Sequence, residues 1–193
     1  MVAKPFISGY ALQWMQPANI GGLFVERFAR GAFDKSLREN GNSVIACWAH
    51  DMTRPLGRVS NGSLELRTDS IGLHYTLWPN PESPMGQEAI ASVGSGLVDQ
   101  VSVCFWSEIE EWNDTADLPE RLITQAGLVE LSILVFGAYG AATSASLSSR
   151  SAAMDNAANA RRRVAKKDGK LSASQIAANV RQAKMEMKFR GIK

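Results

Sequence analysis

The chain contains two histidines, and one of them, His50, lies where a catalytic side chain could stand. It ends the apolar run SVIACWAH (43–50), which predicts a buried strand, and a Thr-Arg-Pro turn follows. An imidazole titrates near neutral pH, so it can accept a proton from a nucleophile and later return it. A histidine with its polar atoms satisfied at the rim of a core is the alternative interpretation of this position.

Two hydroxyl groups lie inside apolar runs, where a polar residue is otherwise unexpected. They belong to Ser102 in DQVSVCFW (99–106) and Ser132 in VELSILV (129–135). A serine becomes a nucleophile when a base such as histidine takes its proton. Cys104 shares a strand face with Ser102, which keeps a Cys104–His50 pair open as an alternative. Locally hydrogen-bonded serines and an inert core cysteine are the other interpretations.

Glu130 is the carboxylate that could orient such a base. It interrupts GLVELSILVF (127–136), a run that otherwise predicts a buried strand. A buried charge is costly unless it is paired, and an imidazole would be a natural partner. On an edge strand Glu130 would simply be solvated. His74, in the alternating run GLHYTL (72–77), fits a surface or pairing role, but it could also replace the carboxylate as the orienting group.

The pattern of apolar residues predicts the elements that must position these groups. Residues 34–40 fit a short helix with Asp34 as its N-cap, and residues 83–96 fit a second helix that starts at Ser83-Pro84. Asn61-Gly62 predicts a two-residue hairpin between two strands. The elements together indicate an α+β domain built on a largely antiparallel sheet or barrel of roughly seven strands. Strands are expected at 5–15, 21–33, 43–50, 55–60, 63–69, 72–79, 98–112 and 127–139.

Composition divides the chain into an acidic body and a basic tail. Residues 1–144 contain 9 Lys and Arg against 16 Asp and Glu, a net charge of −7, whereas residues 145–193 contain 12 against 3, a net of +9. The tail is rich in Ala, Ser and Asn and poor in large apolar residues, so we expect it to be flexible or dependent on a partner for its structure. It has no aromatic platform or groove-reading motif, which argues against nucleic acid as that partner.

The sequence gives no indication of a membrane segment, an export signal or a metal site. It has no apolar run of about 18 residues, and its N-terminus lacks the apolar region of a signal peptide. Cys47 and Cys104 are therefore expected to be reduced thiols in a cytosolic protein. The cysteines and histidines have no metal-ligand spacing, and we expect no metal or cofactor.

Four stretches, in this order, resemble the prohead (procapsid) maturation proteases of tailed bacteriophages. GYALQWM…GGLFVERFARGAFDKSL resembles the opening of the family, and WAHDMTRPLGRV resembles its histidine motif. GLHYTLWP, followed by the helix that ends in GSGLVDQVSVCFW, resembles its serine segment. ITQAGLVELSILVFGAYGAAT resembles the closing strand. The resemblance covers about residues 8–144 and leaves the tail outside it.

The resemblance implies a fold related to the herpesvirus assembly proteases, which is a mainly antiparallel β-barrel of about six or seven strands with a few surrounding helices. Carried over position by position, it makes His50 the general base, Ser102 the nucleophile and Glu130 the third catalytic residue. Where the family often has Ser-Phe-Gly-Phe, this chain has a cysteine, Cys104, two residues after the serine. By analogy with the herpesvirus enzymes, oxyanion-hole donors are expected around Arg58.

The function implied by the resemblance is that of a serine endopeptidase of capsid maturation. Its expected substrates are the scaffold protein, or the scaffold-like N-terminal segment of the major capsid protein, and the protease itself. It would act inside the viral prohead, in the cytoplasm of the host cell, with neither membrane nor nucleic acid as a partner and with a homo-oligomer as one arrangement. The alternative is a non-catalytic assembly or scaffold module that keeps the protease fold. The resemblance implies a protease domain at 1–144 followed by the tail at 145–193.

Overall fold

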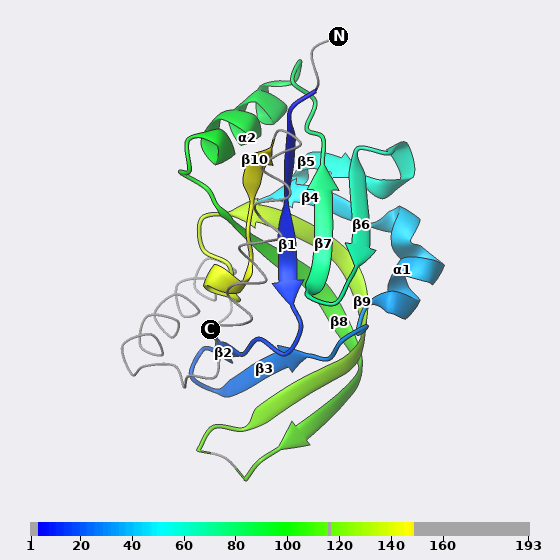
Figure 1. The fold of residues 1–193 in the computed structure, drawn as a ribbon, viewed down its shortest axis with the longest axis vertical. Coiled ribbons are helices and arrows are strands. Elements are labelled where there is room, and N and C mark those ends of the chain that lie inside the picture. The colour runs from blue at the N-terminus through cyan, green and yellow to red at the C-terminus, as the bar shows by residue number, and fades with distance from the viewer. Residues whose placement is uncertain (1–3, 116, 149–193) are drawn as a thin grey trace.

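The computed structural model describes residues 4–148 except residue 116, and within them the chain is mostly β-strand with two short helices (Figure 1). Most of the predicted tail, residues 149–193, lies outside the described residues, so the division at residue 145 stays a prediction. The helices are α1 (Asp34–Asn40) and α2 (Pro84–Gly94). The strands are β1 (Phe6–Gln13), β2 (Ala18–Ile20), β3 (Phe24–Phe28), β4 (Ile45–Trp48), β5 (Asp51–Arg58), β6 (Leu64–Thr68), β7 (Gly72–Leu77), β8 (Gln100–Asn113), β9 (Glu120–Leu134) and β10 (Ser146–Ser148).

The strands form two separate sheets. The first is antiparallel throughout, with the order β10-β1-β7-β6. The second has the order β2-β3-β9-β4-β5, and β8 also pairs with β9. The α+β class is therefore confirmed, but the sheets do not close on each other, and the predicted barrel is not confirmed. The second sheet is also mixed, because β3 and β4 both run parallel to β9.

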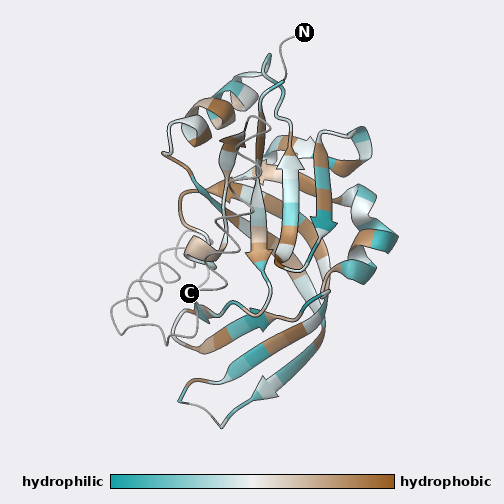
Figure 2. Ribbon diagram, viewed as in Figure 1, coloured by the Kyte–Doolittle hydropathy of each residue, from teal (hydrophilic) through white to brown (hydrophobic). Residues whose placement is uncertain are grey.

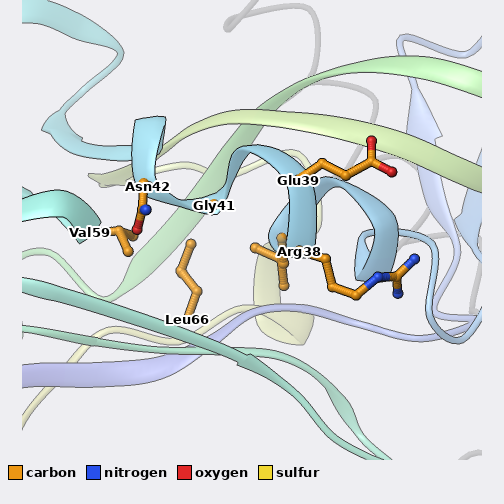
Figure 3. Close-up of a pocket in the computed structure, with 7 residues that line it drawn as sticks. Arg38, Glu39, Gly41, Asn42, Val59 and Leu66 are labelled. Carbon is orange, nitrogen blue, oxygen red and sulfur yellow. The ribbon is translucent and has the colours of Figure 1, made fainter.

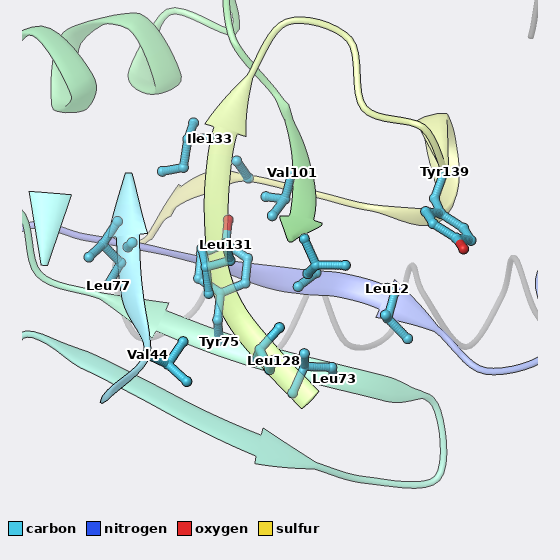
Figure 4. Close-up of a cluster of buried hydrophobic side chains, with 14 of the residues drawn as sticks. Leu12, Val44, Leu73, Tyr75, Leu77, Val101, Leu128, Leu131, Ile133 and Tyr139 are labelled. Atoms are coloured by element: carbon cyan, nitrogen blue, oxygen red, sulfur yellow. The ribbon is translucent and has the colours of Figure 1, made fainter. Parts of the chain in front are cut away.

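The hydrophobic core lies between the two sheets. Leu12, Leu73 and Tyr75 come from the first sheet, and they belong to one buried cluster with Leu131 and Ile133 of the second (Figure 4). Apolar residues accordingly concentrate on the sheets, whereas α1 is largely hydrophilic (Figure 2). The candidate site lies on the face of the second sheet that points away from this core.

Strand β9 is the centre of the second sheet. On one edge its first half pairs with β3 and its second half with β4, while its other edge pairs with β8. The register with β8 shifts at three places, and at the first of them along β8 Cys104 opposes Glu130 but Phe105 opposes Leu128. Val129 is therefore an extra residue on β9, which makes a β-bulge.

Two local predictions differ from the structure and one is confirmed. Asn61-Gly62 does not form a two-residue hairpin, because β5 pairs with β4 and β6 pairs with β7, in different sheets. A 3-10 turn ending at Gly62, whose φ is 74°, connects them instead. Asp34 makes no capping bond to α1; its carboxylate accepts a hydrogen bond from the Thr68 hydroxyl. Ser83 is the predicted cap of α2, since its hydroxyl accepts the Gly86 N–H at 3.0 Å.

Neither of these described helices has the length and hydropathy required to cross a membrane.

Candidate active site

His50 lies in a two-residue turn with an unusual backbone. Ala49 and His50 have φ angles of 53° and 61°, which is the left-handed region that residues other than glycine rarely adopt. Such residues cost of order 1–3 kcal/mol each and persist where the surroundings fix them. Here two hydrogen bonds to β9 hold the turn: the Ala49 N–H donates to the Ile133 carbonyl at 3.0 Å and the His50 N–H donates to Ser132 Oγ at 2.9 Å.

The imidazole of His50 is paired with Glu130. Nδ1 of His50 contacts Oε1 of Glu130 in a close hydrogen bond, and the Glu130 side chain is only 2% exposed whereas that of His50 is 21% exposed. A carboxylate at Nδ1 favours the tautomer with its proton on that nitrogen, so Nε2 becomes the accepting nitrogen. Glu130 is thus buried and paired, and the interpretation of a solvated edge carboxylate is excluded.

Ser102 is placed on the same face of the sheet by strand register. It directly opposes Ser132 on β9, and opposed residues of an antiparallel pair point to the same side. Val101 and Val103 point to the core, so Ser102 points away from it, toward the side on which Ser132 meets the His50 turn. The three residues predicted from sequence are therefore distributed over the end of β4, β8 and β9, with β9 as the strand that connects them.

The two thiols differ in what they could do. Cys47 is in register with Ser132 and fully buried, and its Sγ lies 3.7 Å from the Met52 sulfur. Burial, together with the negative charges of Glu130 and Asp51, raises the pKa of Cys47 to about 11, so it stays a protonated thiol. Cys104 is exposed and opposes Glu130 across the β8–β9 pair. It therefore remains the alternative nucleophile near the site.

Comparison with protein families decides the class of this protein. The family model of the caudovirus prohead serine proteases matches residues 2–157. The chain belongs to this family. A comparison with curated protein sequences finds no match. Family membership implies serine protease chemistry and a place in the phage prohead. The match extends the resemblance from about residues 8–144 to residues 2–157, a range that includes all the described residues.

His74 of this prohead protease family member is remote from His50. It lies on β7, and its neighbours Leu73 and Tyr75 point into the core, so its ring is on the outer face of the first sheet. There it packs edge-on against Tyr10 with ring centroids 5.2 Å apart. The interpretation of His74 as the group that orients His50 is therefore wrong.

The stability of the protein is expected to depend on His74 at mildly acidic pH. Burial, with a smaller contribution from the Arg67 charge, lowers the pKa of His74 from 6.5 to about 4. Between these values the unfolded chain binds a proton that the folded chain does not, so the free energy of unfolding falls as the pH falls from 6.5 to 4, by at most about 1.4 kcal/mol per pH unit. In urea denaturation at pH 7, 6 and 5, the H74F variant should lose less stability than the wild type. Equal losses in the two proteins would contradict this assignment.

Other features of the described residues do not add to the site. A surface pocket between α1 and β6 is lined by Arg38, Glu39, Asn42 and Leu66 among others, and it contains none of the candidate residues (Figure 3). No group of three metal-ligating side chains occurs in residues 4–148 with the gap at 116. The backbone N–H of Arg58 donates to Ser63 Oγ at 2.9 Å, so this one donor is already engaged, and the oxyanion-hole donors expected around Arg58 stay a prediction.

The contribution of Ser132 is what the sequence pattern missed. Ser132 was a candidate only as a hydroxyl in an apolar strand. In the structure its Oγ accepts from the His50 backbone and donates to Glu130 Oε2 at 2.6 Å. The available signal was the spacing Glu-x-Ser, which puts both side chains on one face of a strand.

Proposed function

We propose that this chain is a serine endopeptidase of phage capsid maturation in which Ser102 is the nucleophile, His50 the general base and Glu130 the orienting carboxylate. The observation that carries the proposal is the pairing of His50 Nδ1 with the buried Glu130 carboxylate. This pair lies on the sheet face that also carries Ser102, opposite Ser132. A base held by a third group beside a hydroxyl is the arrangement that nucleophilic catalysis requires.

The chemistry proceeds in two halves. Nε2 of His50 takes the Ser102 hydroxyl proton as Oγ bonds to the scissile carbonyl carbon, and the imidazolium then gives that proton to the leaving amine as the C–N bond breaks. Water hydrolyses the resulting ester by the same route, with His50 again as base. The Glu130 carboxylate holds the ring at Nδ1 and stabilises the imidazolium. A carboxylate inside an apolar strand is thereby explained by the charge that it faces during turnover.

The proposed substrates are proteins of the assembling shell. They are the scaffold protein, or a scaffold-like N-terminal segment of the major capsid protein, together with the protease itself. These substrates fit the family, whose members act in the prohead. The alternative of a non-catalytic assembly module with a protease fold would not need His50 to be held against a buried carboxylate.

A fluorophosphonate probe tests this proposal. An activated serine displaces fluoride from phosphorus and forms a stable Oγ–P bond, so mass spectrometry of digested protein should find the label on the peptide that contains Ser102. Unactivated serines react far more slowly, because their hydroxyl has no adjacent base. The H50A variant should therefore lose the label, whereas H74F should keep it.

Two outcomes would oppose the proposal. Absence of label in folded wild-type protein would favour the non-catalytic module. A label that stays on the same peptide in H50A would show that His50 is not the base.

A further inference from the structure

Ser132 uses both hydrogen-bonding functions of its hydroxyl on the candidate catalytic pair. Its side chain is 0% exposed. Oγ accepts the His50 backbone N–H at 2.9 Å and donates its own proton to Glu130 Oε2 at 2.6 Å. No solvent is needed to satisfy this hydroxyl, since each bond ends on one of the two residues of the pair.

These bonds complete a closed ring of contacts. Glu130 Oε1 meets the His50 ring at Nδ1, while Glu130 Oε2 is joined through the Ser132 hydroxyl to the main chain of the same histidine. The backbone and the ring of His50 are thus both held by β9, through two residues on one face of that strand. Without the hydroxyl, this link between the His50 main chain and β9 would be lost, whereas the ring contact and the Ala49 N–H bond would be retained.

The backbone of the turn explains why a second anchor matters. Ala49 and His50 both have left-handed backbone angles, so a backbone conformation of lower energy becomes available to the turn if one of its hydrogen bonds is lost. A change of backbone angle at His50 moves its ring, and misplacement of a catalytic group by about 1 Å can cost about a hundredfold in rate.

We infer that Ser132 is a positioning residue of the protease, which holds the left-handed turn at His50 and the Glu130 carboxylate in the geometry for proton transfer from Ser102. This inference rests on the proposed function. The competing interpretation is that Ser132 is an ordinary core serine whose loss lowers only stability.

A matched control exists in the same chain. Ser36 is 3% exposed, and its hydroxyl also accepts one backbone N–H across elements, from Leu128 of β9 at 2.9 Å. The S36A and S132A variants should each lose some stability, of order 1 kcal/mol, for a buried hydrogen bond. Of the two serines, only Ser132 contacts the candidate pair. If both serines contribute only to stability, S36A and S132A should therefore change kcat to the same extent.

The experiment measures peptide cleavage and histidine NMR in S132A, S36A and S132T. We expect S132A to lower kcat by about tenfold to a hundredfold with KM little changed, S36A to keep the wild-type kcat, and S132T, which restores a hydroxyl, to recover most of the rate. In an S102A background, which prevents self-cleavage, the low-field proton resonance of the His50 Nδ1–H bond should be present with S36A and broadened or lost with S132A.

The outcomes separate the two proposals. Wild-type kcat and an intact Nδ1–H resonance in S132A would overturn the role of Ser132, as would equal losses of kcat in S132A and S36A. If S132T is destabilised by its extra methyl group, the resonance in S132A against S36A still decides the question. Full cleavage by S102A would instead overturn the proposed function and leave the role of Ser132 without a reaction to serve.

Discussion

Replacing Ser102 with alanine is expected to reduce peptide-bond cleavage by about 10⁶-fold, the loss that follows when the nucleophile of a serine protease is removed. The change removes one hydroxyl from a buried strand position opposite Ser132, so the fold should be retained. The measurement is processing of scaffold and major capsid protein when they are expressed together with the protease, with self-cleavage followed by mass spectrometry.

Cys104 supplies the control for this experiment. It lies two residues along β8, is exposed, and opposes Glu130. The C104A variant should process its substrates at nearly the wild-type rate if the serine is the nucleophile. The reverse pattern, with S102A active and C104A inactive, would make the enzyme a cysteine protease of the same fold. Normal processing by both variants would show that neither residue is the nucleophile.

Replacing Glu130 with glutamine is expected to lower kcat by about 10⁴-fold, the effect of a carboxamide in place of the third member of a triad. The amide can donate a hydrogen bond to Nδ1, which stabilises the tautomer whose Nε2 already has a proton and cannot accept that of the serine. The amide oxygen can still accept from Ser132, so the local packing should survive. Steady-state kinetics on a peptide that contains a mapped cleavage site would measure the change.

Glu26 is a suitable matched residue for comparison. Like Glu130, it is a buried glutamate in the second sheet, 4% exposed, and it accepts hydrogen bonds from Tyr139 and Arg121. Its burial raises its pKa. The E26Q variant should keep a kcat close to that of the wild type, whatever it does to stability. Comparable losses in E26Q and E130Q would mean that the effect comes from removing a buried charge and not from orientation of His50.

The residues of the candidate site could be singled out from sequence by their positions in apolar strands, and their catalytic roles, which stay predictions, came from the family resemblance. A carboxylate and a serine interrupt the apolar residues of β9, and a serine interrupts those of β8, and a buried polar group is costly unless it is paired. His50 was predicted from its place at the end of a strand. The hydrogen bond between the His50 main chain and Ser132 could not be predicted, because it depends on left-handed backbone angles at two residues that are not glycine.

The elements of the fold were predictable where the pattern is local, and its connections were not. The α2 helix was recognised from Ser83-Pro84, and β8 and the second half of β9 from their apolar residues, but the first half of β9, from Glu120, was not predicted. Whether β5 turns back on β6 or joins another sheet depends on contacts with β4 and β7, which are distant in sequence. The Asn-Gly signal describes only the turn itself, and here tertiary pairing determined the outcome.

The extra residue Val129 has a consequence for how such a sequence can change. In an uninterrupted strand, Leu128 and Leu131 would face opposite sides; the extra residue lets both point inward while Glu130 and Ser132 point outward. The site thus depends on the number of residues between Leu128 and Ser132. One insertion or deletion there would turn the side chains on one side of the change to the opposite face of the sheet, so that polar groups of the site would point into the core. An insertion or deletion in this stretch of β9 is therefore expected to be tolerated far less well than a substitution.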